Sequence, residues 1–187
     1  MLRILVTPSV LMAQAAELVL VTLEAFSDSN VFNVTFKFHP TLPAARVMSE
    51  AGVSSLPAHM TIAREAVPAL LKDADVMLYT YSATAIEALA AGVPIVHFAT
   101  NCDIDLDPLA SFSGIRISTG TPEGLREEAV KAVLGVSPAE HAARVRRWRE
   151  VVELLLPPPD SRTIDLFMPD SFREARSSAG HVATNVR

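Results

Sequence analysis

The chain has 187 residues, of which 50% are hydrophobic, and its 16 basic and 21 acidic side chains give a formal net charge of −5. This length suits one well-buried core and is too short for two domains of ordinary size. The negative charge argues against a nucleic-acid-binding surface but is compatible with a local anion pocket. The single cysteine, Cys102, excludes a disulfide framework and a cysteine-based metal site, and it fits a reducing compartment.

Strands and helices are expected to alternate from the start of the chain. The sequence predicts a strand, a helix, a strand and a helix over 3–7, 13–26, 32–38 and 44–51. Pro40 stops the second strand, and Gly52 closes the second helix. We interpret the apolar start as strand, loop and helix rather than a targeting segment, because Pro8 interrupts it early and Glu17 lies inside its second part. No apolar run is long enough to span a bilayer.

The middle of the chain continues the alternation. Strands are expected over 59–63, 76–81, 94–99 and 115–118, and helices over 65–74, 84–91 and 106–112. Gly92 is the expected residue after the end of the 84–91 helix. The pattern predicts an α/β fold: one Rossmann-like domain with a parallel sheet, helices on both of its faces and right-handed crossovers.

Two repeated start signals predict the last helices. Thr121-Pro122-Glu123 places a hydroxyl cap, a proline and an acid at the start of a helix that runs to about Leu134. Ser137-Pro138-Ala139-Glu140 opens a longer helix that ends before the prolines at 157–159. Beyond it the hydrophobicity falls, so we expect a domain over 1–156 and a loosely ordered or disordered tail over 157–187.

Polar side chains gather where the predicted strands end. In a parallel sheet these ends share one edge, which is where such sheets bind ligands. The expected ends are Thr7-Pro8-Ser9, His39-Pro40, Tyr81-Ser82-Ala83-Thr84, Thr100-Asn101 and Thr119-Gly120. Hydroxyls, an imidazole and an amide would thus lie together, which suits a polar ligand.

The stretch 75–100 carries the strongest signal. It reads as a buried strand, a turn containing Ser82, Ala83 and Thr84, a short helix with Glu87 one turn in, and a second buried strand. Free N–H groups at the helix start and the two hydroxyls favour a phosphate there. The alternatives are that Ser82 only caps the helix and that Glu87 is a solvated residue near the favourable end of the dipole.

Three cationic or titratable residues near this edge are further candidates. His39 could donate to a phosphate or to the sugar of a nucleotide, or it could be a structural hydrogen-bonding residue. Lys37 lies two residues earlier on the same face of the strand and either adds positive charge or is an exposed edge lysine. Arg64, beside the third predicted strand, is a candidate for contact with a base or a phosphate.

Two segments resemble a known family. KFHP at 37–40 and ADVMLYTYSATAIEALAAGVPIV at 74–96 resemble the C-terminal, donor-binding half of GT-B glycosyltransferases, especially surface-polysaccharide and sialyltransferase-like enzymes. Those enzymes carry a His-Pro motif and a later serine/threonine motif on the nucleotide side of the cleft. Many GT-B families also carry E-A-x-x-x-G-x-P, which is matched here by Glu87, Ala88, Gly92 and Pro94. The resemblance covers about residues 2–156.

The resemblance implies specific roles. In such families the glutamate holds the ribose of the donor and the serine/threonine turn holds its phosphate, so His39, Ser82, Thr84 and Glu87 become the donor-site residues, with Lys37, Ala83 and Arg64 as additional candidates. GT-B enzymes have two Rossmann-like domains, and the N-terminal one binds the acceptor and supplies the base in inverting members. This sequence shows one such domain and no convincing base, so the catalytic residues stay unassigned.

The expected activity is therefore sugar transfer from a nucleotide-activated donor, CMP-, UDP- or GDP-linked, to a hydroxyl of a glycan or lipid-linked acceptor. The resemblance implies a nucleotide sugar as substrate, with no cofactor and no metal. It also implies an acceptor-binding N-terminal domain or partner chain. The expected location is cytoplasmic, with peripheral contact at the inner membrane face as an alternative. The chain would be an excised half, one chain of a split enzyme or a homologue without transfer activity. Two alternatives are a non-catalytic nucleotide-binding or partner-docking module and an NDP-sugar epimerase-like half.

Overall fold

The computed structural model describes residues 1–101 and 106–157. Contacts between Cα atoms divide the chain into a compact unit, Met1–Val152, and a second unit, Glu153–Arg187. All strands described here belong to the first unit. The tail expected over 157–187 lies outside the described residues except for Pro157, so the expected boundary after residue 156 stays a prediction.

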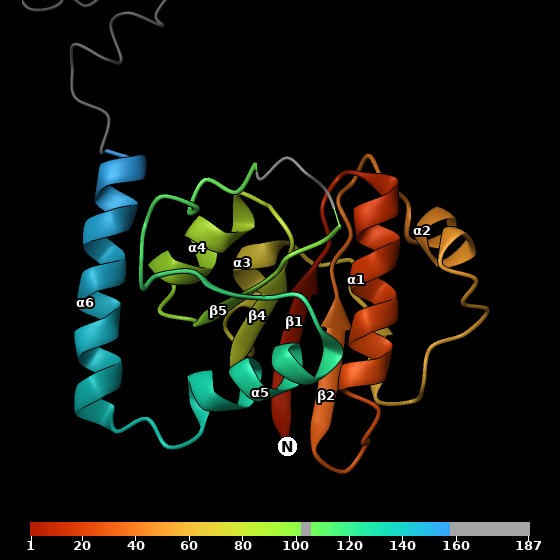
Figure 1. Cartoon of the computed structure of the whole chain (residues 1–187), viewed down its shortest axis with the longest axis horizontal. Coiled ribbons are helices and arrows are strands. Elements are labelled where there is room, and N and C mark those ends of the chain that lie inside the picture. The colour runs from red at the N-terminus through yellow and green to blue at the C-terminus, as the bar shows by residue number, and fades with distance from the viewer. Residues whose placement is uncertain (102–105, 158–187) are drawn as a thin grey trace, which may run out of the picture. The chain divides into compact units, whose positions relative to one another are not determined.

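The described strands form one parallel sheet in the order β3-β2-β1-β4-β5-β6 (Figure 1). They are β1 (Leu2–Thr7), β2 (Phe32–Phe36), β3 (Met60–Ile62), β4 (Val76–Tyr79), β5 (Ile95–Phe98) and β6 (Ile117–Thr119). The chain builds outward from β1 to β3 and then returns to the other side of β1. The strand order therefore reverses between β1 and β4, which creates a switch point at their carboxyl ends.

Helices cover both faces of this sheet, as predicted. The described helices are α1 (Met12–Ala25), α2 (Ala44–Glu50), α3 (Val67–Leu70), α4 (Thr84–Ala90), α5 (Pro122–Val133) and α6 (Pro138–Leu155). Helix α1 packs against α2 and α5, whereas α3 packs against α4. Alternate strand residues such as Ile4, Val34 and Leu78 share one core with α1, α2 and α5. Their neighbours Leu5 and Met77 are buried on the other face.

The helix expected over 106–112 is wrong, because residues 108–111 form turns. The Asp107 carboxylate accepts the backbone N–H of Leu109 (3.1 Å), a local bond that competes with helix formation. Asp107 is buried, and the same side chain also accepts from the Tyr79 hydroxyl (2.8 Å). The strand expected over 115–118 starts two residues later, at Ile117, since the N–H of Ile115 bonds back to the carbonyl of Phe112 (3.2 Å).

The helix expected over 65–74 is only the single turn α3. Pro68 has no N–H and is tolerated only in a first turn, so the helix cannot begin much earlier. A bond from the Asp73 N–H to the Leu70 carbonyl (3.2 Å) tightens the chain just after it. The remaining predicted boundaries of strands and helices lie within one or two residues of the observed ones.

The predicted start and stop signals are present. Thr121 Oγ1 accepts the Gly124 N–H (3.1 Å) at the start of α5. At α6, Ser137 Oγ accepts the Glu140 N–H (3.2 Å) while Glu140 Oε2 accepts the Ser137 N–H (2.8 Å), which is a capping box. Gly92 ends α4 with φ at 78°. In the described part of the chain, no helix is both long and apolar enough to cross a bilayer.

Candidate functional site

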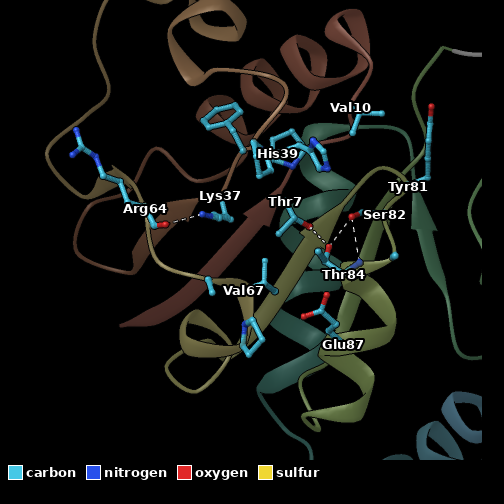
Figure 2. Close-up of a pocket in the computed structure, with 16 residues that line it drawn as sticks. Thr7, Val10, Lys37, His39, Arg64, Val67, Tyr81, Ser82, Thr84 and Glu87 are labelled. Atoms are coloured by element: carbon cyan, nitrogen blue, oxygen red, sulfur yellow. Dashed lines mark hydrogen bonds between the residues drawn. The ribbon is translucent and has the colours of Figure 1, made fainter. Parts of the chain in front are cut away.

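A pocket of about 750 Å³ opens at the carboxyl ends of the strands, next to the switch point between β1 and β4 (Figure 2). Its lining comes from the segments that follow β1, β2, β3 and β4. All of the predicted site residues line it: Lys37, His39, Arg64, Ser82, Ala83, Thr84 and Glu87. The rule that parallel sheets bind ligands at this edge therefore predicted which residues the fold brings together.

Three hydroxyls meet where β1 and β4 end. Thr84 Oγ1 lies 2.8 Å from Ser82 Oγ and 3.2 Å from Thr7 Oγ1. Each hydroxyl can donate one proton and accept others, so this cluster can bond internally in more than one arrangement. Ser82 Oγ also accepts the backbone N–H of Thr84 (3.3 Å). The Ser82 hydroxyl lines the pocket, where it can donate to a ligand.

Free N–H groups were expected at the start of α4, but three of the N–H groups there are already hydrogen-bonded. The N–H of Thr84 bonds to Ser82 Oγ, that of Ala85 to the Ser82 carbonyl (3.1 Å) and that of Ile86 to the Ala83 carbonyl (3.0 Å). The tight first turn satisfies these donors internally. Hydroxyl groups rather than these three N–H groups are therefore the donors that this turn offers to a ligand. Ala83, not Ser82, is the N-cap residue of α4, although Ser82 Oγ accepts one N–H of this turn. Ser82 also lines the pocket, and its contact with a ligand stays a prediction.

His39 lies in the loop that follows β2, because the ladder ends at Phe36 instead of continuing to 38. Its Nδ1 is 2.7 Å from Thr41 Oγ1 and accepts the Thr41 backbone N–H at 3.2 Å. Its side chain is exposed and lines the pocket. In Figure 2 His39 lies beside Val10 and on the same side of the pocket as Ser82.

Glu87 is one turn into α4 and exposed. Figure 2 shows its carboxylate beneath Thr84, on the pocket side of the helix. A carboxylate is an acceptor only, so this group suits a ligand with hydroxyl donors. The pocket therefore presents donors at Ser82 and an acceptor at Glu87, on the same short helix and the turn before it.

The charged ends of Lys37 and Arg64 are not directed together at one position in the pocket. Lys37 Nζ donates to the Arg64 carbonyl (2.9 Å) and so ties the segment after β3 to the end of β2. The Arg64 guanidinium points away from Thr84 and Ser82 in Figure 2, although Arg64 lines the pocket. Backbone N–H groups of Glu65 itself and of Arg64 lower the pKa of the Glu65 carboxyl below its ordinary value, although Glu65 does not line the pocket.

The apolar wall of the pocket was not predicted from the sequence. It includes Val10 from the loop after β1, Phe38 after β2, and Val67 and Pro68 of α3. The ring of Phe38 is stacked near that of Phe36, with centroids 6.0 Å apart. Apolar side chains also fill protein cores, so their type alone does not indicate a pocket. The one sequence signal for this wall is that its residues lie beside predicted strand ends.

Two of the expected strand ends lie elsewhere. Thr100-Asn101 and Thr119-Gly120 do not line the pocket, because β5 and β6 lie on the far side of β4. Asn101 instead donates to Glu17 of α1 (3.1 Å). Among the described residues no group of three histidine, cysteine, aspartate or glutamate side chains is placed to hold a metal ion.

Solved structures share this fold. CalG4, the calicheamicin glycosyltransferase, superposes with a TM-score of 0.60 at 21% identity over 88% of this chain. The glycosyltransferase VinC, solved in complex with dTDP, gives 0.56 at 16% identity over 82%. The UDP-GlcNAc 2-epimerase of Methanocaldococcus jannaschii, solved with UDP-GlcNAc and UDP, gives 0.53 at 18% identity over 80%.

The chain therefore has the Rossmann-like fold of one half of a GT-B glycosyltransferase. It spans 41%, 38% and 45% of those three chains, respectively, so each of them is more than twice as long as the part it shares with this fold. At such identities the likeness concerns the fold. No protein-family model matches the chain, and no curated protein sequence does.

Proposed function

We propose that this chain is the donor-binding domain of a glycosyltransferase and holds a nucleotide-activated sugar in the pocket at its strand ends. The observation that carries the proposal is that one pocket contains both hydrogen-bond donors and a carboxylate acceptor. Ser82 offers a hydroxyl proton, His39 an imidazole, and Glu87 a carboxylate, beside the switch point of the sheet. Phosphate oxygens accept hydrogen bonds and ribose hydroxyls donate them, so a nucleotide matches both sides.

In this proposal Ser82, Thr84 and His39 bind the phosphate of the nucleotide and Glu87 accepts hydrogen bonds from the ribose. The apolar wall at Val67 and Pro68 supplies contact area for the base. The role of the domain in the reaction is electrostatic. Its donors stabilise the negative charge that develops on the leaving phosphate as the glycosidic bond breaks.

The acceptor site and the catalytic base belong, in this proposal, to a second half, as a domain or as a partner chain. The reason is the length of the structural neighbours, of which this chain spans less than half. We further propose that this domain takes the C-terminal position in such an enzyme. A glycan or lipid-linked hydroxyl as acceptor, as in surface-polysaccharide and sialyltransferase-like enzymes, follows from the sequence motifs at 37–40 and 74–96.

Calorimetric titration of the chain with CMP, CDP, UDP, GDP and dTDP tests the proposal. One nucleotide should bind selectively, and Ser82→Ala and Glu87→Ala should each weaken binding by about tenfold or more, because each removes a hydrogen bond that involves a charged group. Ser49→Ala and Glu50→Ala make the same changes on the exposed surface of α2 and should leave the affinity unaltered. Equal binding by all variants would refute the assignment of the pocket.

An epimerase-like half is the second candidate, because the fold is also shared with a UDP-GlcNAc 2-epimerase. Such a domain would change the sugar of its donor without any acceptor. Incubation with UDP-GlcNAc alone, followed by separation of the sugars, distinguishes the two: conversion in the absence of acceptor favours the epimerase. Nucleotide binding without turnover, with or without a second half, favours a non-catalytic module.

A further inference from the structure

We propose that Thr41 is a positioning residue that fixes the tautomer of His39, so that the imidazole presents its Nε2–H as a hydrogen-bond donor to the pocket. The role of that donor rests on the proposed function, whereas the tautomer itself rests only on the contacts of the loop. Thr41 does not line the pocket and would act entirely through His39.

Two groups of Thr41 contact one nitrogen of His39. His39 Nδ1 accepts the backbone N–H of Thr41 at 3.2 Å and lies 2.7 Å from Thr41 Oγ1. A backbone N–H can only donate, so the atom that it faces must offer a lone pair. In a neutral imidazole one nitrogen carries the proton and the other accepts, and the hydrogen bond made by one decides the state of the other. Nδ1 is therefore the acceptor and Nε2 carries the proton.

The backbone around His39 is held by hydrogen bonds and by core packing. Just after β2, the N–H of Lys37 donates to the Val6 carbonyl (2.8 Å), and the N–H of Leu42 donates to the His39 carbonyl (2.9 Å). Leu42 and Phe38 are 7% exposed and belong to the hydrophobic core. The backbone on both sides of His39 is thus anchored, so the Thr41 contacts select a ring state within a fixed frame.

The consequence is a donor that is set before a ligand arrives. His39 has its acceptor nitrogen occupied by Thr41, so its imidazole can only donate into the pocket, beside the Ser82 hydroxyl. Acceptor-rich groups such as phosphate oxygens are favoured over ligands that would need to donate there, since a mismatched donor would leave the Nε2–H of His39 unpaired.

Nitrogen NMR of the imidazole rings tests the tautomer directly. The ¹⁵N shifts of a neutral ring separate a protonated from an unprotonated nitrogen, so spectra are recorded at a pH above which they no longer change. His39→Gln identifies the signals of His39, and the exposed ring of His141 on α6 serves as the reference within the same spectrum. His39 should show an Nε2–H population above that of His141.

Substitutions of Thr41 separate positioning from a general structural effect. Thr41→Val keeps the shape and removes the hydroxyl, so the ratio of Nε2–H to Nδ1–H at His39 should fall roughly fivefold, the value of one ordinary hydrogen bond. Thr41→Ser should restore it. Thr61→Val makes the same change at an exposed site on β3 and should have no effect. An Nδ1–H form in the wild type, or a ratio unchanged in Thr41→Val, would overturn the proposal.

Nucleotide titrations of the same variants test the link to the ligand. The nucleotide that binds the wild type should bind Thr41→Val about threefold to tenfold more weakly, and Thr41→Ser should regain the affinity. Unchanged affinity in Thr41→Val together with a shifted tautomer would refute the role of His39 as a donor to the ligand. If no nucleotide binds the wild type, the proposed function fails, while the NMR ratio still decides whether Thr41 sets the tautomer.

Discussion

Buried polar side chains connect the turns at 108–111 and strand β6 to the middle of the sheet. Asp107 accepts from the Tyr79 hydroxyl at 2.8 Å and pairs with Arg116 at 3.2 Å, and its side chain is fully enclosed. His97, the neighbour of Tyr79 across the sheet, contacts Ser118 Oγ at 2.8 Å. These contacts connect β4, β5 and β6 with the turns at 108–111.

Tyr79→Phe should therefore destabilise the fold by about 1 to 2 kcal/mol, because it removes one donor from a buried carboxylate. The free energy of unfolding in urea measures this. Tyr81→Phe removes a hydroxyl from a half-buried ring in the pocket wall and is the matched control, with an expected change near zero. Equal stability of the two variants would show that the Tyr79–Asp107 bond contributes nothing measurable.

A second prediction at this scale concerns acid sensitivity. Hydrogen bonds from Arg3, at 2.7 Å from its Nη2, lower the pKa of the Asp75 carboxyl below its ordinary value. A carboxyl with a lowered folded-state pKa contributes stability above its unfolded pKa of about 3.9 and loses it as the pH falls through the folded value.

Asp75→Asn should accordingly make the decline of the urea midpoint below about pH 4 shallower than in the wild type. Asp73→Asn is the control, since that side chain is 87% exposed and lies 3.7 Å from Arg3. Parallel profiles for the wild type and Asp75→Asn would contradict the account.

The residues of the pocket could be predicted from the sequence, but their partners could not. His39, Ser82, Thr84 and Glu87 follow predicted strands, and that position alone directs them to one edge. Lys37 was predicted either as positive charge near the ligand or as an exposed edge lysine, and its contact with the Arg64 carbonyl, 27 residues away in sequence, was not predicted. Contacts over such distances depend on the pairing of β2 with β3, which no local pattern specifies.

At the scale of elements, the reliable signals were those with a local physical cause. Gly92 ends α4 because only glycine adopts its φ of 78° without strain, and the N–H of Val93 bonds back to the Ala88 carbonyl (2.9 Å). The helix expected over 106–112 failed because the Asp107 side chain bonds within its own segment and to Tyr79 on β4. An apolar pattern does not reveal that competition.

Gly92→Ala should destabilise the fold by about 1 to 2 kcal/mol, because an alanine there is held in the left-handed region. Its Cβ would lie 3.5 Å from Val145 Cγ2, an ordinary contact, so the cost is conformational rather than steric. Gly120→Ala is the control: its Cβ would lie 3.7 Å from the Ala99 carbonyl, and its φ is not positive. A thermal unfolding midpoint lowered equally in both variants would contradict the prediction.

At the scale of the whole molecule, alternation of strands and helices predicted the class of fold but not the order of the strands. All five predicted strand ends were expected at one site, yet the order β3-β2-β1-β4-β5-β6 separates the ends of β5 and β6 from the pocket. The order depends on which side of β1 the chain returns to after β3. The resemblance at 37–40 and 74–96 correctly indicated one half of a GT-B fold, and the shared fold of CalG4 supports it.

The measurement that tests the central claim most directly is a two-dimensional ¹H–¹⁵N spectrum of the labelled chain, titrated with the five nucleotides. One nucleotide should shift the amide signals of Thr7, His39, Glu87 and the segment Tyr81–Thr84, which line the pocket. Signals from the groove between α2 and β3, such as those of Met48, Leu56 and Met60, should stay in place. Shifts confined to that groove, or no shifts with any nucleotide, would contradict the assignment of this pocket as a donor site.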